Sequence, residues 1–221
     1  MTAQARRHRA RRGSGDLLRA EILTAAKELL VETGSEELVS VRAIADRVGV
    51  TTPSIYLHFA DKQTLLDTVC GQVFAQLDER MEQASRGVAP PFEALRRRGM
   101  AYVEFGLANA EHYRILLLRR PVEGADANST DASVAASAFG HLEDAVQACI
   151  DAGTFGADED PRALALVLWA AVHGITALLI AKPHFPWPAD REAIADLVVR
   201  TAGLGLVMRG QLASMQSTPG A

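Results

Sequence analysis

A glycine between two short runs of helical periodicity constrains the fold of this chain more than any other feature. Residues 41–62 read VRAIADRVGVTTPSIYLHFADK, and Gly49 divides them. Ser40 is placed to cap a first short helix, and Thr51 is placed to cap a second that has Pro53 in its first turn. Glycine readily takes the left-handed conformation that ends a helix. The pattern therefore predicts a helix-turn-helix.

The outer side of the second helix carries small polar residues, one phenol and one imidazole. In a DNA-binding helix-turn-helix, the N-terminal part of this helix faces base edges in the major groove. Hydroxyl groups bond to bases or phosphates, and Lys62 at the start of the next helix suits a phosphate. The outer residues are Thr51, Thr52, Pro53, Ser54, Tyr56, Leu57 and His58. A helical hairpin that binds no ligand has the same spacing, so spacing alone leaves both interpretations open.

Helical spacing of apolar residues continues through most of the chain, and strand patterns are scarce. A first helix is expected from Leu17 to Gly34, and a long helix capped by Asp61 is expected to reach about residue 85. Pro90 and Pro91 begin a second helical unit. Its helices are expected at about 92–109, at the short stretch EHYRILLL, and at about 132–152, 160–181 and 189–210. The sequence thus predicts an all-α protein.

Charge is distributed unevenly along the chain. Residues 1–62 hold ten Lys/Arg against eight Asp/Glu, whereas the remainder holds thirteen against nineteen, so the front is electropositive although the net charge is −4. The first twelve residues contain five arginines, Arg11 and Arg12 among them, and no acid. Such an arm suits contact with phosphates or the minor groove, and a solvated tail is the alternative. We expect residues 1–14 to form a disordered basic arm.

Enzyme, metal and secretory signatures are not found in the sequence. It contains no G-x-S-x-G, no glycine-rich phosphate loop and no H-E-x-x-H, so neither an enzyme nor a cofactor is expected. Cys70 and Cys149 stand far apart, which predicts no disulfide framework and fits a reducing cytoplasm. His141 and Cys149 are eight residues apart and supply at most half of a metal site, so no metal is expected. A protein that responds to a bound metal ion is the alternative. The basic start leads into an amphipathic segment, unlike a secretory signal.

Three features of residues 17–66 occur in register: an amphipathic helix ending in Gly, the I-A-x-x-x-G-V hinge, and S-I-Y-x-H-F-x-x-K-x-x-L. They resemble the N-terminal domain of the TetR family of bacterial transcriptional regulators. The resemblance implies an all-helical protomer of about nine helices, a homodimer, and a palindromic operator of double-stranded DNA. It divides the chain into a helix-turn-helix domain (15–62), a connecting helix (63–87) and an effector-binding and dimerisation domain (88–215). It implies DNA contacts from Arg42, Thr51, Thr52, Ser54, Tyr56, His58 and Lys62, with Tyr56 and His58 facing phosphates and Thr52 and Pro53 facing bases.

A second resemblance lies in LALVLWAAVHGITAL, where Trp169, His173 and Gly174 follow the W-x-x-x-H-G pattern of a TetR C-terminal subtype often called the WHG domain. Trp and His four apart share one helix face, where they line a pocket or pack in an interface. The family resemblance implies a small, mostly apolar effector that shifts the spacing of the two DNA-reading heads. Candidate pocket residues, each with plain core packing as its alternative, are Tyr102, Phe105, Tyr113, Phe139, His141, Trp169 and His173.

Residues 163–181 contain no acid, Lys or Arg and approach the length of a membrane span. Six alanines, one glycine, His173 and Thr176 lower their hydrophobicity, so we expect a helix that a second protomer covers and no membrane partner. Together with the last helix, this segment predicts a dimer interface of four helices, two from each protomer. The expected interface residues are Leu168, Ile175, Leu179, Ile194, Leu197, Val198, Thr201 and Leu204.

The sequence therefore predicts a cytoplasmic, homodimeric, ligand-responsive repressor that releases its operator when an effector binds. The alternative is a helical protein-interaction module without specific DNA binding, which would show no salt-dependent affinity for duplex DNA.

Overall fold

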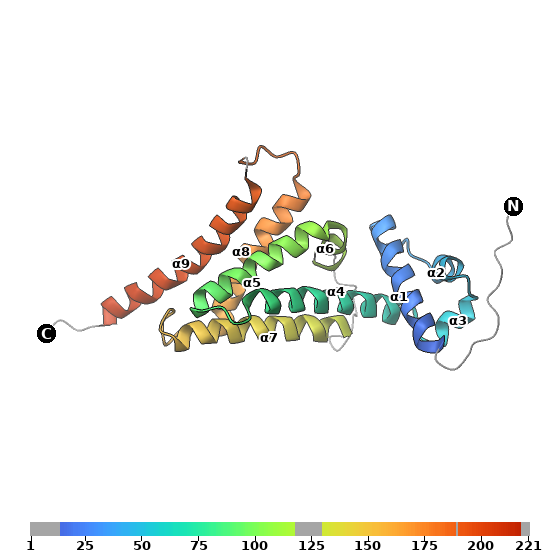
Figure 1. Ribbon diagram of the computed structural model, residues 1–221, viewed down its shortest axis with the longest axis horizontal. Coiled ribbons are helices and arrows are strands. Elements are labelled where there is room, and N and C mark those ends of the chain that lie inside the picture. The colour runs from blue at the N-terminus through green and yellow to red at the C-terminus, as the bar shows by residue number, and fades with distance from the viewer. Residues whose placement is uncertain (1–13, 118–129, 189, 218–221) are drawn as a thin grey trace. The chain divides into compact units, whose positions relative to one another are not determined.

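The chain was analysed as a computed structural model, which describes residues 14–117, 130–188 and 190–217. Those residues form nine helices and no strand (Figure 1), which confirms the predicted all-α class. The helices are α1 (Ser14–Thr33), α2 (Val41–Val48), α3 (Thr52–Tyr56), α4 (Lys62–Ser85), α5 (Pro91–Ala108), α6 (Ala110–Leu117), α7 (Thr130–Asp151), α8 (Pro161–Ala181) and α9 (Arg191–Ser217).

The described residues fall into two compact units. Unit 1 comprises Met1–Phe74 and Glu111–Val134, and unit 2 comprises Ala75–Ala110 and Ala135–Ala221, each taken over its described part. The division falls inside α4, which contributes its first half to unit 1 and its second half to unit 2. Each unit has an apolar core of its own.

The core of unit 1 holds α2 and α3 through side chains spaced for one helical face. Ile44 and Ile55 are almost completely buried and pack with residues of α1 and the start of α4. Ser40 caps α2, because its side-chain oxygen accepts a hydrogen bond of 3.1 Å from the Ala43 backbone N–H. Gly49 ends α2 at φ 77°, where a side chain would be strained. The predicted helix-turn-helix is therefore present.

The capping predicted for α3 is wrong in one detail. Thr51 occupies the N-cap position but makes no side-chain bond to the helix backbone. Its hydroxyl instead lies 2.9 Å from the Ser54 hydroxyl. Asp61 does cap α4 as predicted, since its carboxylate accepts from the Thr64 N–H at 2.7 Å.

Unit 2 is built on α5, α8 and α9, which pack against one another. Glycines allow α9 to approach its neighbours closely: a Cβ at Gly203 would lie 2.8 Å from the ring of Phe92, and one at Gly210 would lie 2.9 Å from the backbone nitrogen of Gly156. The last helix is longer than predicted and extends to Ser217.

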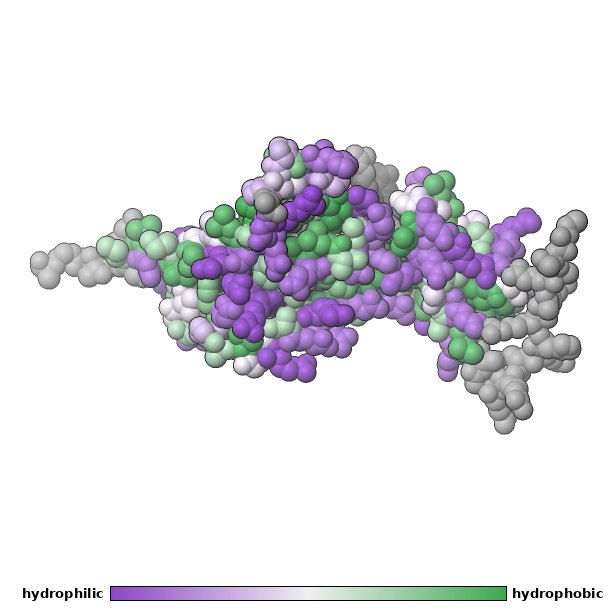
Figure 2. Space-filling model, turned by 45° about the horizontal axis from the view of Figure 1, so that its top comes forward, coloured by the Kyte–Doolittle hydropathy of each residue, from purple (hydrophilic) through white to green (hydrophobic). Residues whose placement is uncertain are grey.

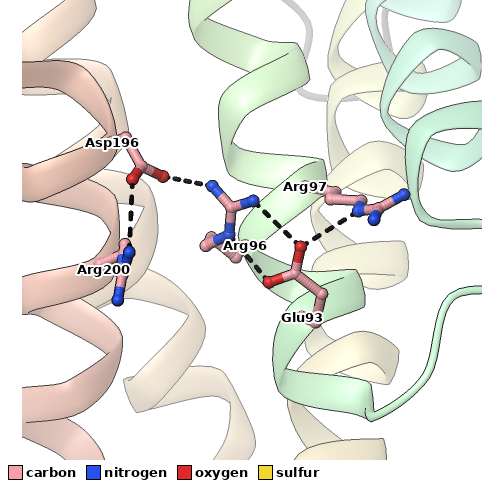
Figure 3. Close-up of polar contacts among 5 residues, drawn as sticks. All are labelled: Glu93, Arg96, Arg97, Asp196 and Arg200. Carbon is pink, nitrogen blue, oxygen red and sulfur yellow. Dashed lines mark hydrogen bonds and ion pairs between the residues drawn. The ribbon is translucent and has the colours of Figure 1, made fainter. Parts of the chain in front are cut away.

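Arg96 joins α5 to α9 by an ion-pair network (Figure 3). Its guanidinium bonds Glu93 on its own helix and Asp196 on α9, and Arg97 also donates to Glu93. These two arginines hold the pKa of Glu93 down at about 2. Arg200 lies 3.8 Å from the other oxygen of Asp196. The network therefore fixes α9 against α5 at one edge of the unit.

Helix α8 is, over the described residues, the one helix long and apolar enough to cross a membrane by length and composition. The protein itself buries 39% of its most apolar window, with Leu164 and Ala165 in the core of unit 2. Trp169 and Leu178 are exposed on the same helix. A core helix of a soluble protein passes the same test, so composition alone does not make α8 a membrane span.

Candidate functional site

The outer surface of α3 is small, polar and accessible. Thr51, Pro53 and Tyr56 are exposed, and Thr52 and Ser54 are half-buried, while Ile55 between them points into the core. Thr52 and Pro53, expected to face bases, and Tyr56, expected to face a phosphate, therefore lie together on one five-residue helix. His58 follows α3, and its backbone N–H bonds to the Ile55 carbonyl.

Two cations that were predicted to contact DNA have partners within unit 1. The Lys62 ammonium group donates to the backbone carbonyl of Glu36 at 2.6 Å, so it is fixed at the start of α4 with further N–H donors to offer. Arg42 is highly exposed and lies 3.9 Å from Asp46, a contact worth little in water. Arg11 and Arg12 lie outside the described residues.

Arg47 has a structural position that sequence reasoning did not assign. It makes a two-pronged contact with the Glu32 carboxylate, with both N–O distances at 2.7 Å, and lies 3.6 Å from Glu28. The hydrogen bonds from Arg47 lower the pKa of Glu32. Arg47 thus ties α2 to α1 and is less available to DNA than its exposed helix suggests.

Unit 2 brings four of the expected pocket residues into one aromatic cluster. The Tyr102 hydroxyl lies 3.0 Å from Nδ1 of His173, and the ring centroid of His173 lies 5.8 Å from that of Trp169. Trp169 meets Phe139 edge-on at 6.0 Å, and the Arg162 guanidinium lies over the Phe139 ring. Burial lowers the pKa of His173, which favours the neutral imidazole. The cluster therefore combines apolar rings from α5, α7 and α8 with a hydroxyl and a neutral imidazole.

The other three expected pocket residues occupy different surroundings. His141 pairs with Asp78 of α4 at 2.8 Å. Tyr113 is buried and belongs to unit 1, whereas Phe105 is half-buried on α5. Arg162 was not predicted, because a side chain 23 residues from Phe139 gives no local signal of contact.

The residues expected at a dimer interface divide into three groups by exposure. Leu197, Thr201 and Leu204 are exposed on α9, and Leu168, Ile194 and Val198 are half-buried. Ile175 and Leu179 are 6% and 2% exposed, covered by the protomer itself, so these two were wrongly expected to be available to a partner. The exposed large apolar residues of α8 are Leu166, Val167, Trp169 and Leu178.

Comparison with known proteins matches two parts of the chain to one family of regulatory proteins. Residues 22–69 match the family described as bacterial regulatory proteins of the tetR family, and residues 95–202 match the tetracyclin repressor-like C-terminal domain. The HTH-type transcriptional activator FasR of Mycolicibacterium smegmatis is 30% identical over 137 residues, which are 62% of this chain and 57% of that protein. The HTH-type transcriptional repressor KstR of Mycobacterium tuberculosis is 32% identical over 66 residues, or 30% of each chain. The chain thus spans between about a third and three fifths of these relatives.

Solved structures share the fold over nearly the whole chain. A protein of unknown function from Rhodococcus sp. RHA1 has a TM-score of 0.75 at 25% identity, and the superposition covers 93% of this chain and all of that one. The transcriptional regulator FadR of Bacillus subtilis, solved in complex with stearoyl-CoA, has a TM-score of 0.70 at 19% identity, covering 84% of this chain and 98% of that one. With its helix-turn-helix and its C-terminal helices both matched to the family, the chain belongs to the TetR family of bacterial regulatory proteins.

Proposed function

We propose that this protein is a homodimeric transcriptional regulator of the bacterial cytoplasm that represses from a palindromic operator and releases it when a small ligand binds unit 2. It is not an enzyme in this proposal. One observation carries the proposal: the polar side of α3 is exposed, while its Ile55 packs in an apolar core with residues of α1, α2 and α4. Helices α2 and α3 lie within residues 22–69, which match the tetR family of bacterial regulatory proteins.

In this proposal, some groups of unit 1 contact base edges of the DNA duplex and others contact its phosphates. Thr52 and Pro53, at the start of α3, face base edges, whereas Tyr56 donates its hydroxyl to a phosphate. Lys62 keeps its bond to the Glu36 carbonyl and directs another N–H to a phosphate. Arg42, Thr51, Ser54 and His58 complete the surface, with the arm residues Arg11 and Arg12 reaching the minor groove.

The test begins with selection of bound fragments from genomic DNA at physiological salt, followed by binding titrations on the selected palindrome. Lys62→Ala should weaken binding on all sequences and reduce the salt slope by about one. Lys62→Arg should restore the slope, and Lys182→Ala, in the exposed loop after α8, is the matched control. Tyr56→Phe should weaken binding without changing the slope. An absence of any selected sequence, or an affinity insensitive to salt, would favour a helical interaction module instead.

The proposed dimerisation through α8 and α9 is supported by the apolar residues that these helices leave exposed. On α9 they include Leu197, Leu204, Met208, Leu212 and Met215, spaced so that they recur along one side of the helix. Figure 2 shows apolar residues toward the C-terminal end of α9. A palindromic operator requires two reading heads, so a second protomer is the partner proposed for this surface.

The ligand site is assigned to the aromatic cluster of unit 2. Rings of Phe139 and Trp169 offer apolar contact, and the Tyr102 hydroxyl with His173 offers a polar pair, the mixture that small-molecule sites use. FadR, which shares the fold, was solved with stearoyl-CoA, so long-chain acyl-CoA is the first probe. A Trp187→Phe variant leaves Trp169 as the one tryptophan. Its fluorescence should change as acyl-CoA is added, and Tyr102→Phe should weaken that response.

Activation is the second candidate, because the relative FasR, named as an activator, matches 62% of this chain. Transcription in vitro from the selected promoter distinguishes the two. We expect the amount of transcript to fall as protein is added, as repression requires. A rise in the amount of transcript would instead show activation.

A further inference from the structure

A second polar cluster lies inside unit 2, between α4, α5 and α7. Asp78 and Glu82 are four residues apart on α4 and therefore share a helix face. His141 reaches them from α7, which runs beside this part of α4 (Figure 1), and its Nδ1 lies 2.8 Å from one oxygen of Asp78. Asp78, Glu82 and His141 offer one ligand atom each, all within 4.8 Å of one another. The three side chains thus converge on one point.

Arg98 of α5 supports these carboxylates from the protein interior. Its Nη2 donates to the Asp78 oxygen that His141 does not contact, at 3.1 Å, and its Nη1 donates to one oxygen of Glu82. One oxygen of Glu82 remains outside these contacts. Metal-binding carboxylates are commonly oriented by such outer hydrogen bonds.

The same guanidinium contains an unsatisfied donor, which is independent of the cluster's own hydrogen bonds. Arg98 is 2% exposed, and its Nε–H has no hydrogen-bond partner among the described residues. A buried donor without an acceptor is costly, because water no longer solvates it. An oxygen atom of a ligand held in this cluster would supply the acceptor.

We propose that Asp78, Glu82 and His141 bind one divalent transition cation of the zinc class. One imidazole nitrogen and two carboxylate oxygens suit such an ion, whereas Mg²⁺ favours oxygen ligands and retains its water. Three protein ligands leave coordination positions for water or a small anion, whose oxygen would accept from Arg98 Nε. The site depends on no DNA contact and on no effector, so it stands apart from the proposed function.

Charge and access favour a cation over a closed ion-pair cluster. The carboxylates of Asp78 and Glu82 face one guanidinium, so these three groups together carry one negative charge that a cation would neutralise. The side chains of Glu82 and His141 are 43% and 44% exposed, so an ion can enter from solvent, while Asp78 and Arg98 form the floor.

The experiment is a calorimetric titration of chelator-treated full-length protein with ZnCl₂. One ion per chain is expected, together with a rise in the thermal unfolding midpoint of about 5 °C at free Zn²⁺ one hundred times the dissociation constant. His141→Ala and Glu82→Gln, which alter the two accessible ligands, should each lose at least tenfold in affinity. The matched controls are His184→Ala in the loop after α8 and Glu79→Gln on the neighbouring face of α4, and both should bind as the wild type does.

Cobalt provides an independent readout, since the visible absorption of Co²⁺ changes when nitrogen coordinates it. The wild type should produce this change and His141→Ala should not. Absence of stoichiometric Zn²⁺ binding would overturn the proposal and leave a structural ion-pair cluster. Equal Zn²⁺ binding by the wild type, His141→Ala and Glu82→Gln would also overturn it, because the ion would then lie elsewhere. If His141→Ala fails to fold, Glu82→Gln carries the comparison.

Discussion

Replacing Gly210 by alanine tests the close packing of α9 against the turn after α7. A Cβ at this position would lie 2.9 Å from the Gly156 nitrogen and 3.2 Å from its Cα. Both are backbone atoms, so no side-chain rotation relieves the contact and the helix or the turn must move. Overpacking of this kind costs about 1–3 kcal/mol, while alanine gains about 1 kcal/mol in helix propensity.

Gly205→Ala on the same helix isolates the packing term, because a Cβ there meets nothing within 4 Å. Both variants gain the same propensity, so their difference in unfolding free energy should be the packing cost, about 2 kcal/mol at the middle of that range. For a chain of this size the difference separates the thermal midpoints by about 4–8 °C. Gly140→Ala on α7, also in open space, is a second control away from α9.

The assay is circular dichroism during heating and in urea, at one protein concentration because dimerisation shifts the midpoint. Gly210→Ala should melt below the wild type and Gly205→Ala at or above it. Coincident midpoints for the two variants would refute the close approach of α9 to Gly156.

Two further perturbations test single interactions in the two units. Ser40→Ala removes the acceptor for the Ala43 N–H and should cost about 1 kcal/mol, whereas Ser40→Gly should cost only a few tenths. An unchanged stability of Ser40→Ala in urea denaturation would show that the cap contributes nothing. Glu93→Gln tests the carboxylate whose pKa is lowered to about 2 by Arg96 and Arg97. Because a lowered pKa stabilises the fold above the ordinary value of 4.5, the stability difference between wild type and variant should be full at pH 7 and disappear as the pH falls from 4.5 to 2. A difference that is constant over that interval would exclude the ion pairs as its cause.

Local signals predicted the helices well because helical periodicity, caps and glycines act within a few residues. Gly49 and Asp61 perform the roles that their neighbours in sequence indicate. Thr51 was different, since its hydroxyl can accept from a backbone N–H of the helix or pair with the Ser54 hydroxyl, and sequence does not rank these two partners. The end of α9 was predicted near residue 210, although the sequence after it contains no proline until residue 219 and the helix continues to Ser217.

Contacts between distant segments were less predictable. Helix α8 is apolar on nearly every side, so periodicity does not separate the face that packs internally, with Ile175 and Leu179, from the face that remains exposed. His141 was grouped with aromatic residues by type, but the packing of α7 beside α4 directs it to Asp78. The spacing of Asp78 and Glu82 was a usable signal, since acids four apart share a face, although nothing local identifies the helix that meets them.

The basic residues near α3 contact other groups of the protein, and under the proposed function this affects how fast the protein meets DNA. Arg47 is held by Glu32, Lys62 by the Glu36 carbonyl, and Arg42 lies near Asp46, while the whole chain is negative by four charges. Arg47 is thereby neutralised, whereas Lys62 bonds a neutral carbonyl and keeps its charge, and the exposed Arg42 is paired only weakly. The long-range attraction of this surface for DNA therefore comes from Arg42, Lys62 and the arginines of residues 1–12. Salt screens such an attraction, so the rate of encounter with DNA should fall as the ionic strength rises.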